Sequence, residues 1–472
     1  SRRLFRVRMS PRYQATINEK INPTVEFRNG KAYIRWTTTT PSVTILDWGT
    51  SGTASTRYED FSLKISHEVV LSGIEPGDVL AYTVVHSENG VETRSHTFTT
   101  SRYWDYSPPA LPDQSGYQTG GSWAAHAAGI LALPGVPDRG YCLDYLCGEG
   151  KLAYELVRQS QLVVIAVEDT QAEVDTASSF LKARGVYGSR VTVILASDLN
   201  NLPFKPNTFN LAVSGEHYNG SGQTLAALNT AVERYLKPGR GMTVADNYSS
   251  MVKPVATGTG TYTHQYANAA NTGTTEDELG NKKHIDDFGL QWIGRPGPEI
   301  VIDRMVRAPA PLAANGRMYC QGMGRVLGLD SHNGTVLWTR EIRDLRRLNM
   351  LRDAGNMTAD DDGLWLAVHG ECWKLAGDKG SRTAFSLQDG SRSDFEYAWG
   401  YVGRTGNQLL GSATKSDAFY KNYWTQDAWF DAQSGHETYQ VVSDNLFSLN
   451  KDTGALNWKY EDGLILNVTI TV

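Results

Sequence analysis

Leu329-Asp-Ser-His-Asn-Gly-Thr-Val-Leu-Trp338 returns in altered form as Leu449-Asn-Lys-Asp-Thr-Gly-Ala-Leu-Asn-Trp458. Each copy contains a strand end, an Asp/Asn-x-x-x-Gly turn, a second strand and a tryptophan. Such a turn needs glycine at positive φ, and an internal repeat of one supersecondary unit indicates a repeat architecture. We interpret each copy as the closing hairpin of a β-propeller blade, with Trp338 and Trp458 wedged between neighbouring blades.

Weaker copies of this pattern lie between the two. Tight turns precede apolar strands at Asn315-Gly316, Asp362-Gly363 and Gly406-Asn407. Their spacing is roughly 40 to 50 residues, which is about one blade. We predict three blades, over Ala308–Trp338, Ala354–Leu387 and Tyr397–Tyr460.

The end of the chain predicts an unfinished ring. Ile465-Leu-Asn-Val-Thr-Ile-Thr-Val472 has the composition of a further strand. A propeller closes with about four to eight blades, so three blades leave an open edge. We expect a continuation of the chain past Val472 or a second polypeptide to complete the ring. A start at Ser1 rather than Met also suggests a processed product.

Composition limits the class of protein. The 472 residues are 40% hydrophobic and 20% charged, with 46 glycines and a net charge of -6. These values suit a folded, turn-rich chain of about three domains, and the negative net charge does not indicate nucleic-acid binding. No apolar run approaches the roughly 20 residues of a membrane helix. The arginines between Arg2 and Arg12 form a basic N-terminal arm.

Short alternating strands fill residues 24–100, as in a β-sandwich. The segment Leu71-x-x-Ile74-x-Pro76-Gly77-x-x-x-x-Tyr82 resembles the tyrosine-corner segment of fibronectin type III domains. Trp36 lies where those domains keep a core aromatic residue. The resemblance covers about 80 residues and implies a module that spaces, presents or binds.

After a proline-rich stretch over 101–139, interpreted as a linker, the pattern changes to strand, turn and helix. Apolar strands are expected at 141–145, 162–167, 191–195 and 209–213. Amphipathic helices are expected after Gly150, around Val174 to Leu181 and around Leu225 to Leu236. Continuous apolar strands alternating with such helices predict a doubly wound parallel sheet over 140–250.

The turn after the first of these strands contains a recognisable glycine motif. Leu143-Asp144-Tyr-Leu-Cys-Gly148-Glu-Gly150 resembles the first motif of class I S-adenosylmethionine methyltransferases. In that family the glycines let the backbone approach the cofactor at a helix N-terminus. Leu146 stands where the family has its first glycine, and we expect its side chain to crowd the methionine end of the cofactor.

The resemblance extends over about 110 residues. It implies that Glu168, at the end of the second strand, contacts the ribose hydroxyls and that Asp198 contacts the adenine. After the fourth strand, Glu216 and His217 are candidates for acid-base catalysis. The alternative is an inherited fold that no longer binds the cofactor.

The C-terminal repeats resemble those of quinoprotein-type (PQQ-like) propellers. Together with the stretch Thr263–Asn271, the whole chain resembles multidomain bacterial, planctomycete-type proteins that join the three modules. Quinoprotein dehydrogenases have adjacent cysteines, whereas the four cysteines here stand apart, so we do not expect pyrroloquinoline quinone or a metal. Buried structural thiols are expected instead, at Cys142, Cys147, Cys320 and Cys372.

The predicted organisation has five parts: an arm over 1–23, a fibronectin type III-like sandwich over 24–100, a linker over 101–139, a methyltransferase-like domain over 140–250 and an incomplete PQQ-like propeller over 251–472. Two β-rich modules beside a damaged glycine motif favour an extracytoplasmic binding or assembly protein. Such a protein would be periplasmic, on the cell surface or secreted, with a cytoplasmic location left open. The alternatives are an active S-adenosylmethionine-dependent methyltransferase and a quinoprotein-type oxidoreductase.

Overall fold

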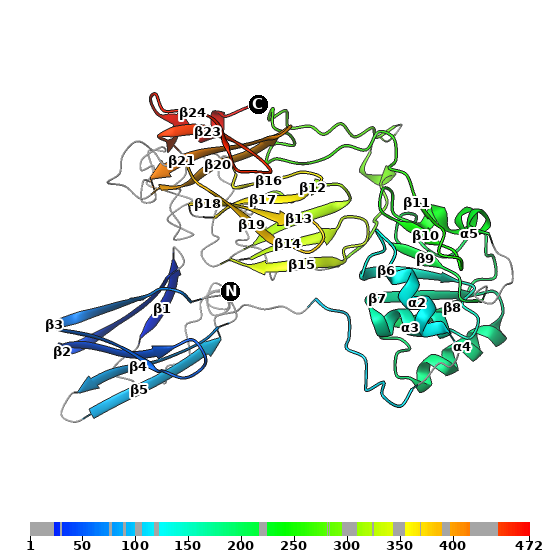
Figure 1. Cartoon of the computed structure of the whole chain (residues 1–472), viewed down its shortest axis with the longest axis horizontal. Coiled ribbons are helices and arrows are strands. Elements are labelled where there is room, and N and C mark those ends of the chain that lie inside the picture. Colours follow the sequence, from blue (N-terminus) through cyan, green and yellow to red (C-terminus); the bar gives the residue numbers. More distant parts are fainter. Residues whose placement is uncertain are drawn as a thin grey trace. The chain divides into compact units, whose positions relative to one another are not determined.

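The computed structural model describes residues 23–28, 31–74, 78–87, 91–99, 106–117, 122–216, 224–280, 282, 284–294, 309–322, 325–342, 355–368, 370–388, 397–415 and 442–472 (Figure 1). The chain divides into two compact units. The first comprises Ser1–Asp105, Gly322–Val326 and Arg340–Arg346, and the second comprises Tyr106–Gln321, Leu327–Thr339 and Arg347–Val472. Within the described ranges, no helix combines the length and the apolar character needed to span a bilayer.

The N-terminal sheet has five antiparallel strands: β1 (Thr24–Arg28), β2 (Lys31–Gly49), β3 (Thr56–Leu71), β4 (Val79–Ser87) and β5 (Val91–Thr99). Where short strands were expected, β2 is one strand of 19 residues, because register shifts near Ser42 let the β2–β3 ladder continue. Trp36 is buried and stacks on His67 at a centroid distance of 5.0 Å. Tyr82 is also buried.

The middle of the chain forms the predicted doubly wound sheet. Its strands are β6 (Arg139–Tyr145), β7 (Gln161–Glu168), β8 (Val191–Leu195), β9 (Leu211–Val213), β10 (Met242–Val244) and β11 (Ser250–Val252). The order is β11-β10-β9-β6-β7-β8, and only β11 is antiparallel to its neighbour. The strand order therefore reverses between β6 and β9, which is where open α/β sheets bind ligands.

Helices cover both faces of this sheet. They are α2 (Trp123–Leu131), α3 (Lys151–Gln159), α4 (Gln171–Ala183) and α5 (Leu225–Val232). One core cluster joins the buried sides of α2, α3 and α4 to the sheet, and a second joins the sheet to α5. The interpretation of 101–139 as a linker is wrong for α2, because Ala127 and Ile130 are buried in the first cluster.

Three four-stranded sheets follow, each in the range where a blade was expected. The first has β12 (Leu312–Ala314), β13 (Arg317–Gly322), β14 (Arg325–Asp330) and β15 (Val336–Glu341). The second has β16 (Met357–Ala359), β17 (Gly363–Val368), β18 (Glu371–Ala376) and β19 (Arg382–Ser386). The third has β20 (Tyr397–Thr405), β21 (Gln408–Lys415), β23 (Asn445–Asn450) and β24 (Leu456–Tyr460).

The C-terminal segment departs from the prediction. Instead of one long strand, it forms the short strand β25 (Ile465–Leu466), paired with β22 (Val442–Ser443), and a 3-10 turn over Asn467–Thr469. The cause is side-chain chemistry. The Asn467 side chain is fully buried, and its Oδ1 accepts hydrogen bonds from Ser412 and Ser443. This draws the chain back onto the third sheet.

Buried polar contacts join the α/β domain to the first four-stranded sheet within the second unit. Lys237 forms an ion pair with Asp330, and Asn210 Nδ2 donates to Asp330 Oδ2 at 2.8 Å. Arg139 Nη1 donates to the Leu337 carbonyl at 2.8 Å. Asn210 directly precedes β9 and Arg139 begins β6, so these contacts lie at the amino ends of the parallel strands. The carboxyl ends, where a ligand is expected, are at the opposite edge.

Candidate cofactor site

The sequence-predicted cofactor residues are brought together at the carboxyl ends of the parallel strands. Asp144 lies one residue before the end of β6, and Glu168 is the last residue of β7. Asp198 follows β8, in a segment that is tied to β7 because Ala196 N donates to the Glu168 carbonyl at 2.8 Å. The ends of β6, β7 and β8 thus place three carboxyl groups and the glycine turn along one edge of the sheet.

The glycine turn links β6 to α3. Gly148 has φ of 57° and Gly150 has φ of 75°, and Gly150 caps the N-terminus of α3. A side chain at Gly150 would stand 3.3 Å from Leu181 Cδ1 on α4, so this glycine is required both by its backbone conformation and by close packing. The turn therefore places the N-terminus of α3 at the edge of the sheet where the strand order reverses.

Glu168 holds this turn in place. Its Oε1 accepts a hydrogen bond from Gly148 N at 2.5 Å, while Cys147 N donates to the Val167 carbonyl. Burial raises the pKa of the Glu168 carboxyl to about 7, and hydrogen bonds from the turn counter part of this rise. The negative charges of Glu173 and Glu216 raise the pKa further. Glu168 therefore exchanges a proton near neutral pH.

Asp144 is fully buried behind the turn. Its Oδ1 accepts from Gly215 N at 2.7 Å, whereas Oδ2 has no hydrogen-bond partner. Burial raises the pKa of Asp144 well above its ordinary value, the backbone N–H groups of Gly215 and Ala153 counter part of the rise, and the nearby charge of Glu168 adds to it. A buried carboxyl oxygen without a partner costs stability.

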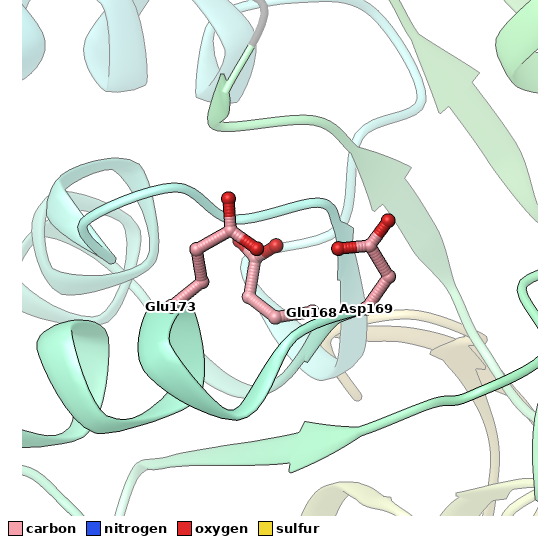
Figure 2. A group of neighbouring side chains, drawn as sticks. All are labelled: Glu168, Asp169 and Glu173. Carbon is pink, nitrogen blue, oxygen red and sulfur yellow. The ribbon is translucent and has the colours of Figure 1, made fainter.

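Glu168 belongs to an acidic group with Asp169 and Glu173 (Figure 2). One carboxylate oxygen of each lies within 4.8 Å of the others. Glu173 is engaged in the N-cap of α4, since Thr170 Oγ1 donates to it at 2.5 Å and accepts from its backbone N–H. Glu168 is buried and holds the glycine turn, whereas Asp169 is exposed.

Leu146 occupies the position of the family's first glycine in an unusual way. It adopts the left-handed conformation, with φ of 58°, and its side chain packs against the apolar cluster on the α5 side of the sheet. A left-handed non-glycine residue costs roughly 1 to 2 kcal/mol. The backbone thus keeps the glycine geometry, and the expected crowding of the cofactor stays a prediction.

Sequence reasoning missed Gly215. A side chain there would stand 2.7 Å from the Cys147 carbonyl, so only glycine lets the segment after β9 lie on the glycine turn. Glu216 N donates to the Leu146 carbonyl at 2.8 Å, and the Glu216 side chain is exposed. The signal was available as the glycine in Ser214-Gly-Glu216. His217, the other catalytic candidate, lies outside the described residues.

The remaining sequence candidates have structural roles where they are described. Asp360 accepts from Gly363 N within its turn, from Trp365 Nε1 and from Arg404, so its carboxylate holds the turn before β17. The four cysteines are free thiols, and all but Cys320 are buried. Asp198 is exposed, and its Oδ1 accepts from Asn200 N in a turn.

Comparison with known proteins supports the assignment of this domain. A family model described as "Methyltransferase domain" matches residues 142–239. A Methanococcus maripaludis structure described as an S-adenosyl-L-methionine-dependent methyltransferase is 25% identical, with 26% of this chain and 54% of that chain covered and a TM-score of 0.23. A Galdieria sulphuraria structure described as a sarcosine dimethylglycine methyltransferase is 21% identical, with 26% and 45% covered and a TM-score of 0.23.

The match spans about half the length of these solved chains, and scores at this level carry no argument about activity. The comparison with curated proteins found no match. Residues 142–239 of this chain therefore form a methyltransferase domain of the α/β class, set among antiparallel β-sheets.

Proposed function

We propose that the α/β domain binds S-adenosylmethionine at the carboxyl ends of β6 and β7 and transfers its methyl group to a nucleophilic substrate. The observation that carries the proposal is the contact between Glu168 and the glycine turn. One carboxylate oxygen positions Gly148, and the same side chain lies at the strand end where the resemblance implies ribose binding.

The residues present fit this cofactor. The turn places the N-terminus of α3 beside the strand ends, and Asp144 Oδ2 is a buried oxygen without a hydrogen-bond partner. When bound, S-adenosylmethionine supplies an electrophilic methyl group whose bond to the sulfonium sulfur breaks as the nucleophile attacks. Glu168 would accept hydrogen bonds from the ribose hydroxyls in its ionised form. Glu216, exposed beside the turn, would take the proton that the nucleophile releases.

Calorimetric titration with S-adenosylmethionine and with S-adenosylhomocysteine tests the proposal. We expect micromolar binding to the whole chain and a loss of at least tenfold in Glu168→Ala. Asp169→Ala is the matched control, because it removes a neighbouring carboxylate from the same acidic group but does not contact the turn. Absence of binding by the wild-type protein at millimolar ligand, with the fold intact by circular dichroism, would overturn it.

A second candidate function is a binding or assembly protein that keeps the methyltransferase fold without using it. Two observations favour it: Leu146 replaces a glycine of the motif, and the segment after β9 bonds to the turn through Glu216 N and to Asp144 on β6 through Gly215 N. An extracytoplasmic location belongs with this candidate, because such compartments supply no S-adenosylmethionine. Failure of both the wild type and Leu146→Gly to bind the cofactor would favour it.

We further propose that the N-terminal sheet is a fibronectin type III-like module and that the three four-stranded sheets are propeller blades of the quinoprotein type. The buried Trp36 and Tyr82 support the first assignment. The second is supported by the equal strand number of the three sheets and by their positions in the expected ranges. In this setting the β modules would bind a partner or present a substrate.

A further inference from the structure

The loop between β10 and β11 contains a tyrosine in a backbone conformation that favours glycine. Tyr248 has φ of 63°, and its N–H donates to the Ala245 carbonyl at 2.9 Å. Ala245 N in turn donates to the Ser249 carbonyl at 2.9 Å, which closes the loop. A bulky side chain in the left-handed region costs stability, and short hairpin loops usually place glycine or asparagine there. The turn alone therefore does not explain a tyrosine at this position.

Helix α2 holds the ring of this tyrosine. A side chain at Gly129 would stand 2.5 Å from Tyr248 Cε1 and 2.8 Å from its hydroxyl oxygen, so the ring lies directly on the helix. Gly129 is inside α2, where glycine lowers helix stability relative to alanine. The Tyr248 hydroxyl also lies 3.2 Å from His126 Nδ1, at hydrogen-bond distance. The helix thus fixes the orientation of the ring through one close contact and one hydrogen bond.

The ring is held in this way although it is not part of the core. Tyr248 is 40% exposed, whereas His126 beneath it is 1% exposed. Two locally unfavourable residues, a left-handed tyrosine and a glycine inside a helix, therefore place a ring that stays largely open to solvent. Backbone strain of this kind is concentrated where a protein contacts a ligand. The arrangement therefore points to a ligand contact.

Tyr248 lies at the edge of the sheet that carries Asp144 and Glu168. It follows β10, which is parallel to β9, and only β9 separates β10 from β6. Neighbouring strands are about 4.8 Å apart, so the ends of β6 and β10 are roughly 10 Å apart. Ribose and adenine are assigned to β7 and β8, on the other side of β6. The transferable methyl group would therefore point towards β9, and an acceptor would approach between the glycine turn and Tyr248.

The segments on this side of the glycine turn contain no basic side chain. Lysine and arginine are absent from α2, from residues 211–224 and from residues 245–252, whereas Glu216 and Asp246 contribute two carboxyl groups. Burial lowers the pKa of His126 to about 4, so its imidazole is neutral near pH 7 and does not repel a cation. The acceptor side of the site thus combines negative charge with an open aromatic ring, which is the environment that favours a cationic group.

We propose that Tyr248 is a specificity-determining residue whose ring binds an ammonium or quaternary ammonium group of the methyl acceptor. The acceptor carries this cation in addition to the nucleophile that receives the methyl group. The inference rests on the proposed function and deepens it by naming the substrate class. His126 and Gly129 are positioning residues, because they act on the acceptor only through Tyr248.

Binding of choline in the presence of saturating S-adenosylhomocysteine tests the proposal. The matched control ligand is 3,3-dimethylbutan-1-ol, which has the shape of choline but a neutral carbon in place of the quaternary nitrogen. We expect calorimetry to show that the wild type binds choline roughly tenfold more tightly than the control ligand, the size of a desolvated cation–π contact. Tyr248→Leu should lose this preference and keep its affinity for S-adenosylhomocysteine. Tyr248→Phe should retain the preference, because the face of the ring binds the cation.

Gly129→Ala is an independent test that leaves Tyr248 in place. The new methyl group would stand 2.5 Å from the ring, so the ring must move and the preference for choline should fall as in Tyr248→Leu. Alanine is the better helix former, so α2 should be retained and the test does not depend on the folding of Tyr248→Leu. Ala128→Ser, at an exposed position of the same helix, is the matched control and should leave the preference unchanged.

The outcomes separate this inference from the proposed function. If the folded wild type does not bind S-adenosylhomocysteine, the proposed function fails, and the inference fails with it. If S-adenosylhomocysteine binds but choline and 3,3-dimethylbutan-1-ol bind equally, the inference alone is overturned. An unchanged preference in Gly129→Ala and Tyr248→Leu, with the folds intact by circular dichroism, would also overturn it. Loss of the preference in Tyr248→Phe would assign recognition to the hydroxyl group and contradict a role for the ring face.

Discussion

Replacement of Asp330 by Asn should destabilise the second unit by about 3 to 5 kcal/mol, which is the usual cost of removing one partner of a buried ion pair. Asp330 is fully buried and Lys237 is only 7% exposed at its side chain. In Asp330→Asn the new amide group faces two donors, Lys237 Nζ and Asn210 Nδ2, and the ammonium group is left buried without a counter-charge.

The repeat itself shows that the turn tolerates this change. Asn450 holds the equivalent position in the third sheet, where its Oδ1 accepts from Asp452 N and Thr453 N at 3.0 Å. In the first sheet, Asp330 Oδ1 accepts from His332 N at 3.0 Å. The substitution therefore keeps the turn and removes the ion pair. Any loss of stability reports on the contact between the α/β domain and the first sheet.

Equilibrium unfolding in urea, followed by far-ultraviolet circular dichroism, measures this loss. Asp362→Asn is the matched control, because its partners Lys374 and Lys451 are more exposed and such surface pairs contribute about 0 to 1 kcal/mol. The double variant Lys237→Met/Asp330→Asn should lose less than the sum of the two single variants. A loss in Asp330→Asn no larger than in Asp362→Asn, or strictly additive losses, would refute the reasoning.

Three further predictions concern the candidate site and the core. Gly150→Ala should lower the free energy of unfolding, measured by thermal or urea denaturation, by about 1 to 2 kcal/mol. The reason is that φ at this position is 75° and that Leu181 lies 3.3 Å from the new methyl group. An unchanged free energy of unfolding would contradict this. Cofactor affinity, measured by calorimetry, should rise as pH increases through about 7, because Glu168 must ionise to accept the ribose hydroxyls, and a pH-independent affinity would argue against that role. Burial lowers the pKa of His264 to about 4. The stability that depends on a neutral His264, up to about 3 kcal/mol, is therefore complete above pH 6.5 and is lost as pH falls towards 4. Unfolding across this range should show a shallower loss in His264→Gln, and an unchanged profile would contradict the assignment.

The sequence predicted which of these residues share one edge of the sheet, because that placement depends on local rules. Glycines after a buried strand specify a left-handed turn, and the carboxyl ends of parallel strands share one edge. Asp144, Gly148, Gly150 and Glu168 therefore meet as the order of strands requires. Whether these residues bind S-adenosylmethionine stays a prediction. Gly215 was missed because its role depends on the Cys147 carbonyl, a contact between residues 68 positions apart.

By itself, the sequence predicted the doubly wound domain and the three ranges that form antiparallel sheets, because hydrophobic periodicity and turn glycines act within a few residues of one another. Helix α2 was not predicted, because its apolar face is short and becomes apparent only from the core against which it packs. Only the tertiary structure decided which repeat positions face a neighbour. Trp338 and Trp458 are equivalent in sequence, yet one is buried on Gly377 and Gly380 and the other is exposed. Burial is a property of what packs against a side chain, and a local pattern does not contain it.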